Sequence, residues 1–178
     1  MGKMFLGKAA RILFTLAFLI GCTTQSTTQI QKPFDPVEYR VLSIEACVNR
    51  TDYKGTHDLA AEATRALTKK LEESELFDIK PDANLVLTCD IMRFGEGSSL
   101  KRWVMPGRGI TQAEVVVMVW KKAGEQVLAT FRSEASIKSG GFYTVGADQY
   151  IFAVAFDDLL KEMKAWASGN EAEESDGQ

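Results

Sequence analysis

The chain has 178 residues, with 21 lysines and arginines, 24 aspartates and glutamates and a formal net charge of −3. This length suits one domain with short flanking segments, and the lack of a basic excess argues against nucleic acid as a partner. One histidine and three cysteines, without the spacing of metal ligands, predict no metal site and no cofactor.

The first residues predict an exported lipoprotein. Three basic side chains precede the apolar run 12–20, which is the order of charged and apolar regions in a bacterial secretory signal. The run is too short for a helix across a bilayer, which needs about 20 apolar residues. It ends in Leu19-Ile20-Gly21-Cys22, a lipobox in which small Gly21 precedes the thiol to be acylated. We therefore expect cleavage after Gly21 and a lipid anchor on Cys22.

This leader divides the chain and predicts its location. Residues 1–21 are expected to be the signal peptide, and their removal leaves a mature chain of net charge −6. Resemblance to bacterial lipoproteins implies several acyl chains on Cys22, enough to hold a soluble domain at a membrane. In the sorting scheme that this resemblance implies, an Asp after the acylated cysteine retains a lipoprotein in the inner membrane, whereas here the next residue is Thr23. The expected location is the periplasmic side of the outer membrane.

The mature chain divides into three parts. Residues 22–36 are polar, rich in Thr and Gln, and end in two prolines, so they predict a flexible tether. Residues 37–167 are expected to form one α+β periplasmic domain. Residues 168–178 contain four acidic side chains and predict a disordered tail.

Hydrophobic periodicity predicts the elements of this domain. Alternating apolar residues indicate strands, and apolar residues at helical spacing indicate amphipathic helices. The predicted strands are 37–48, 84–94, 111–121 and 126–137, with a short extended piece at 76–79, and the predicted helices are 58–74 and 147–167. These elements predict a two-layer α+β fold, with a mixed or antiparallel sheet of four to five strands covered on one face by two helices.

The two remaining cysteines are predicted to stay reduced. In a regular strand 37–48, Cys47 lies on the more polar face, whereas Cys89 lies on the apolar face of its own strand. Side chains on opposite faces of a sheet cannot bring their Cβ atoms to the roughly 4 Å that a disulfide needs. A bulge in either strand would reverse this expectation.

Several short stretches resemble one known family. They are the run 71–77, the glycines before Lys101-Arg102-Trp103, the turn at 107–109 leading into the strand Ala113-x-Val115-x-Val117, and the loop Gly140-Gly141-Phe142. Their order and spacing resemble a family of small bacterial lipoproteins known as a domain of unknown function, family 4410, over roughly 37–166. The resemblance implies an envelope lipoprotein without established activity, and it supplies no catalytic residues.

The most prominent candidate for partner binding is the glycine-rich segment 95–110. Arg102, Trp103 and Arg108 are the residues we expect to contact an envelope protein, because exposed arginines and aromatics supply much of the binding energy of interfaces. The structural alternative is that Trp103 packs against the edge of the sheet. By contrast, His57 and Asp58 are adjacent at a helix start and point apart, so they predict a helix cap and no catalytic pair.

The sequence therefore favours a non-enzymatic lipoprotein that binds another envelope component through a loop or a sheet edge. A second hypothesis is a small-ligand or lipid carrier with a cavity between helices and sheet, lined by Met118, Trp120, Phe152 and Phe156. A third is a hydrolase, which would need a cluster of perturbed ionisable groups in a cleft.

Overall fold

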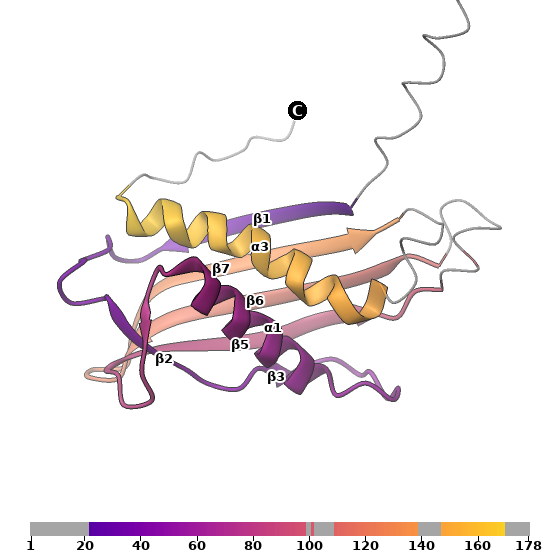
Figure 1. Ribbon diagram of the computed structural model, residues 1–178, viewed down its shortest axis with the longest axis horizontal. Coiled ribbons are helices and arrows are strands. Elements are labelled where there is room, and N and C mark those ends of the chain that lie inside the picture. Colours follow the sequence, from indigo (N-terminus) through magenta and orange to yellow (C-terminus); the bar gives the residue numbers. More distant parts are fainter. Residues whose placement is uncertain (1–21, 99–100, 102–108, 139–146, 170–178) are drawn as a thin grey trace, which may run out of the picture.

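The computed structural model describes residues 22–98, 101, 109–138 and 147–169 and has an α+β fold (Figure 1). The described residues include the two helices α1 and α3 and a mixed sheet of seven strands, more than the four to five predicted. In chain order the elements are β1 (Cys22–Ile30), β2 (Val41–Ile44), β3 (Val48–Asn49), α1 (Leu59–Ser74), β4 (Asp78–Ile79), β5 (Leu85–Gly95), β6 (Thr111–Lys121), β7 (Gln126–Ile137) and α3 (Ala147–Ala167). None of the helices in the described ranges is long and apolar enough to cross a membrane.

The sheet combines an antiparallel half with a parallel half. Its strand order is β1-β7-β6-β5-β2-β4, and β3 pairs with β5 beyond the end of β2. β1, β7, β6 and β5 pair antiparallel, whereas β5 with β2, β5 with β3, and β2 with β4 pair parallel. Parallel neighbours need a crossover connection, and α1 supplies it between β2 and β4.

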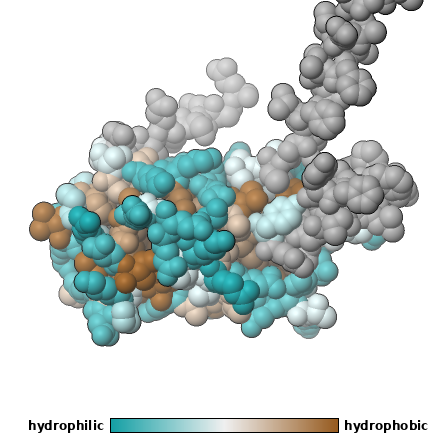
Figure 2. Space-filling model, in the orientation of Figure 1, coloured by the Kyte–Doolittle hydropathy of each residue, from teal (hydrophilic) through white to brown (hydrophobic). Residues whose placement is uncertain are grey.

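Both helices bury an apolar stripe. Asp58 caps α1 by accepting a hydrogen bond from the Ala61 amide at 3.0 Å, and α1 ends where Glu75 adopts a left-handed conformation with φ of 53°. The buried residues of both helices form one hydrophobic cluster with the sheet: Leu59, Ala63, Leu67 and Leu71 from α1, and Ile151, Phe152, Ala155, Phe156, Leu159, Leu160, Met163 and Trp166 from α3. Figure 1 shows both helices in front of the strands, and Figure 2 shows that side of the molecule as mostly hydrophilic with hydrophobic patches.

Side chains alternate along each strand and define two faces of the sheet. The core face joins the hydrophobic cluster through residues such as Cys89 of β5, Val117 of β6 and Phe131 of β7, which are register partners. The outer face carries their sequence neighbours, such as Thr88 and Met118, which are also register partners and are partly exposed. The period of two residues in a strand makes this division strict wherever the pairing is regular.

The segment 22–36 was predicted to be a flexible tether, and this prediction is wrong. Its first nine residues form β1, an edge strand paired with β7 along its whole length. The amides of Gln31 and Lys32 then donate to the carbonyl of Leu128 at 2.9 and 3.0 Å, and the Phe34 ring lies 5.0 Å from that of Trp166. The polar composition was misleading because an edge strand is held through its backbone and needs no apolar alternation.

The predicted strand 37–48 is also interrupted. β2 ends at Ile44, and the irregular residues Glu45 to Cys47 separate it from β3. The amide of Cys47 donates to Thr64 Oγ1 in α1 at 2.8 Å, and the Cys47 side chain is buried in the hydrophobic cluster beside Cys89. The structure joins Cys47 and Cys89 in a disulfide with a Cα–Cα distance of 4.5 Å, so the prediction of free thiols is wrong. The break in the strand interrupts the alternation of side chains and turns Cys47 to the core face, with the same effect on the prediction as a bulge.

This disulfide generates the first prediction. It joins cysteines 42 residues apart, and constraint of an unfolded loop of that size is worth about 4 kcal/mol in the chain-entropy model. We expect the variant with both Cys47→Ala and Cys89→Ala to lose about that much free energy of unfolding in urea denaturation. Thiol titration of the denatured, unreduced mature protein is the control: two reactive thiols from these positions would contradict the bond.

Candidate functional site

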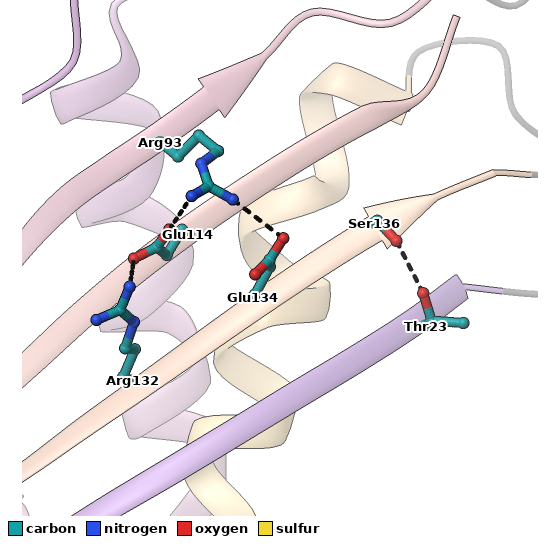
Figure 3. A network of polar contacts seen from close by, with 6 residues as sticks. All are labelled: Thr23, Arg93, Glu114, Arg132, Glu134 and Ser136. Carbon is teal, nitrogen blue, oxygen red and sulfur yellow. Dashed lines mark hydrogen bonds and ion pairs between the residues drawn. The ribbon is translucent and has the colours of Figure 1, made fainter. Parts of the chain in front are cut away.

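Four charged residues form a network on the outer face of the sheet, which we call the outer-face network (Figure 3). Arg93 of β5 lies with Nη2 3.4 Å from Glu114 Oε2 and with Nη1 3.3 Å from Glu134 Oε1. Arg132 of β7 pairs with the other oxygen of Glu114. Figure 3 shows these side chains in front of the strands, with both helices behind them.

The register explains why an arginine is needed here. Glu114 and Glu134 are direct register partners on β6 and β7, and like charges at such positions repel each other. Arg93 is the register partner of Glu114 on the other side, so its guanidinium bridges both carboxylates. Three adjacent strands are thereby tied together on the outer face.

A β-bulge places Arg93 on that face. Leu85, Leu87, Cys89 and Ile91 of β5 all point to the core, so unbroken alternation would send Arg93 there as well. The register of β5 against β6 shifts between Ile91 and Arg93, which moves Arg93 outward and Phe94 inward. The Phe94 ring then stacks on the Phe152 ring of α3 with a centroid distance of 5.8 Å. The bulge therefore adds Phe94 to the packing of the core and places Arg93 in the outer-face network.

The burial of the network is uneven. The Glu114 side chain is only 4% exposed, whereas those of Arg93 and Arg132 are 52% and 58% exposed. A carboxylate so far removed from water requires compensating partners, and the two guanidinium groups supply them. The two positive and two negative charges cancel, which suits a stable surface better than a binding site for a small ion.

The predicted partner-binding residues Arg102, Trp103 and Arg108 lie outside the described residues. The described flanks show where their segment leaves and rejoins the domain, because the Ser98 amide donates to the Gly109 carbonyl at 3.1 Å. The other predicted site residue, Cys22, is the first residue of β1, and its Cα is paired with that of Ile137.

The cavity predicted for a carrier is not formed by the residues named for it. Phe152 and Phe156 are buried in the hydrophobic cluster at 1% and 0% exposure. Met118 and Trp120 alternate with the core residues Val117 and Val119 and therefore lie on the outer face. These four side chains stand on opposite sides of the sheet and cannot line one pocket.

The single histidine lies near a carboxylate, though not the one next to it in sequence. His57 Nδ1 is 3.0 Å from Glu62 Oε1, while Asp58 caps α1. Nearby, the Tyr53 hydroxyl donates to Glu96 Oε2 at 2.9 Å, and burial, reinforced by this hydrogen bond, raises the pKa of Tyr53. No group of three or more His, Cys, Asp or Glu side chains within the described ranges is placed to hold a metal ion.

The uneven burial of the network leads to the second prediction. In Glu114→Gln the side-chain amide turns an N–H group toward a guanidinium, so a nearly buried acceptor is lost, and we expect a decrease of about 1–3 kcal/mol in the free energy of unfolding. Glu134→Gln is the matched control, because that side chain is 45% exposed and its ion pair is worth less than about 1 kcal/mol. Urea denaturation of both variants measures the difference, and equal losses would argue against a special role of Glu114.

Comparisons with known proteins support the fold. A crystallised dodecamer of PelC from Paraburkholderia phytofirmans aligns with a TM-score of 0.54 and 12% identity, over 84% of this chain and 99% of PelC. The hypothetical protein CT253 from Chlamydia trachomatis aligns with a TM-score of 0.52 and 13% identity, over 73% of this chain and 99% of CT253. At these identities the likeness shows a shared fold and nothing more.

At the level of sequence, no functionally curated protein matches the chain. One family model does match, over residues 43–141, which is more than half of the chain and includes β5, β6, β7 and the outer-face network. The chain therefore belongs to the family described as a domain of unknown function, DUF4410.

Proposed function

We propose that the mature chain is a bacterial envelope lipoprotein, anchored in the outer membrane through acylated Cys22 and facing the periplasm. The supporting observation is the sequence itself, in which three basic residues precede the apolar run 12–20 and this run ends in the lipobox Leu19-Ile20-Gly21-Cys22. A peptidase acting after Gly21 would remove the apolar leader and leave Cys22, which belongs to β1, at the N-terminus. Thr23, in place of an aspartate, supports the outer membrane in the sorting scheme described above.

Within the envelope, the proposed role is non-enzymatic binding or assembly. The charged residues of the outer-face network form ion pairs with one another on the outer face of the sheet, where they stabilise the surface. The contact between His57 and Glu62 is separate from this network. PelC, which shares the fold, is described as a dodecamer, so this architecture is compatible with assembly of like chains. Arg102, Trp103 and Arg108 remain the proposed partner contacts, in a segment whose described flanks are held together by the hydrogen bond from Ser98 to Gly109.

The anchor gives the third prediction. Acyl chains on Cys22 would be the strongest attachment of the mature chain to a membrane, so Cys22→Ser is expected to abolish lipidation and to leave uncleaved precursor or soluble protein. Membrane fractionation together with mass spectrometry of the N-terminal peptide measures this. A Thr24→Ser variant, changed two positions away, is expected to behave like the natural chain. Maturation and outer-membrane retention of the Cys22→Ser protein would contradict the proposal.

The partner contacts give the fourth prediction. Replacement of Arg102, Trp103 and Arg108 with Ala is expected to abolish crosslinking to a partner in native membranes while the melting temperature stays nearly unchanged. A control with Lys122→Ala and Glu125→Ala alters exposed residues of the β6–β7 turn and is expected to keep the crosslink. If Trp103 instead packs on the sheet, Trp103→Ala alone should lower the free energy of unfolding by about 3–5 kcal/mol. Such a loss together with unchanged crosslinking would remove this segment from the candidate sites.

A further inference from the structure

The attachment of β1 bears on how the domain meets the membrane, an inference that rests on the proposed acylation of Cys22. That residue is itself part of the ladder between β1 and β7, with Cys22 opposite Ile137 and Thr23 opposite Ser136. The hydroxyls of Thr23 and Ser136 are also hydrogen-bonded at 2.8 Å. No flexible residue therefore separates the proposed acylation site from the sheet, whereas a free tether over 22–36 would reach about 20 Å.

The same ladder shows which end of the domain lies beside Cys22. Ile137 is also the register partner of Thr111, the first residue of β6, and Gly95 at the end of β5 pairs with Gln112. With neighbouring strands about 4.8 Å apart, these four strand ends form a row about 15 Å long. In Figure 1 they lie at the right, where the indigo start of β1 meets the ends of β7 and β5 and the start of β6.

The opposite end of the domain is distant from this row. β7 has 12 residues, so the turn at Lys122 that precedes it lies about 40 Å from the Cys22 end. The end of α3 is also there, because Trp166 Nε1 donates to the carbonyl of Lys32 at 2.9 Å, and the Lys32 amide donates to Leu128 near the start of β7. In the sequence, the four acidic residues of the segment 168–178 follow this end of α3.

β1 is held firmly enough to transmit an orientation. Midway along the strand, Ser26 Oγ and Thr28 Oγ1 donate to the two carboxylate oxygens of Glu162 in α3 at 3.1 and 2.9 Å. At its end, the chain is fixed by the bonds to Leu128 and by the packing of Phe34 on Trp166. The strand thus cannot swing away from the sheet without breaking contacts at its start, its middle and its end.

We propose that this geometry fixes the domain upright on the lipid surface. The end formed by the start of β1, the end of β7 and the start of β6 lies against the phospholipid headgroups, and the β6–β7 turn points away from them. The described charges at the near end include exposed Lys101 and Lys138 as well as Glu96. In this proposal the insertion of the acyl chains is the force that holds the near end at the membrane. The outer-face network then faces sideways, parallel to the membrane plane, where a neighbouring protein of the same membrane can reach it.

Two lysines at opposite ends of the domain allow a matched test. Lys138→Cys at the near end and Lys122→Cys at the far end each replace an exposed lysine with a single labelling site, because Cys47 and Cys89 are bonded and Cys22 is acylated. Each variant is purified from membranes as the full lipoprotein, labelled with a fluorescent donor, and placed in vesicles of phosphatidylethanolamine and phosphatidylglycerol that carry an acceptor on the headgroup. Energy transfer falls steeply with distance, so we expect several-fold more transfer from position 138 than from position 122.

A variant with an added flexible linker between the acylation site and β1 provides the control. An insertion of about 12 Gly and Ser residues between Cys22 and Thr23, with a reach of about 20 Å, is expected to keep vesicle binding and to remove most of the difference between the two labels. Equal transfer from both positions in the natural chain, or more from position 122, would overturn the upright orientation alone if mass spectrometry shows acylated Cys22. Absence of acyl chains would overturn the proposed anchoring and the orientation together.

Discussion

The alternation of side chains along β6 is the constraint on which most of this structure depends. β6 pairs with β5 and β7 over almost its whole length, so its register fixes both neighbours. Ala113, Val115, Val117 and Val119 point to the core, and Glu114 is thereby forced to the outer face together with Met118 and Trp120. The hydrophobic cluster, the outer-face network and the lack of a cavity lined by residues of both faces all follow from this one strand.

Much of the fold could be predicted from the sequence, because its long elements carry strong periodic patterns. The helices at 58–74 and 147–167 and the strands at 84–94, 111–121 and 126–137 are confirmed to within one residue at each end. The family resemblance is confirmed as well. In each of these elements the apolar residues repeat at the spacing of a helix or of a strand, so only that secondary structure brings them to one buried face.

The features that sequence reasoning missed depend on backbone pairing, which leaves little trace in residue types. β1 has Ser26 and Thr28 on one face and threonines and glutamines on the other, so its pattern is that of an unstructured segment. The bulge after Ile91 and the break after Ile44 each shift the phase by local backbone geometry. Without them, Arg93 would be assigned to the core and Cys47 to the polar face, and neither the outer-face network nor the disulfide could be derived. Arg102, Trp103 and Arg108 stay predictions.

The disulfide between Cys47 and Cys89 closes a covalent ring that contains β3, α1, β4 and the first half of β5. The turn at Lys80, Pro81 and Asp82 lies in this ring and is exposed, so it is a natural point for a protease to cut. A chain cut there would not fall into two pieces, since the bond still joins the part that carries Cys22 to the part that carries β6, β7 and α3. With the anchor that we propose on Cys22, a single cut in this turn would leave the whole domain attached to the membrane.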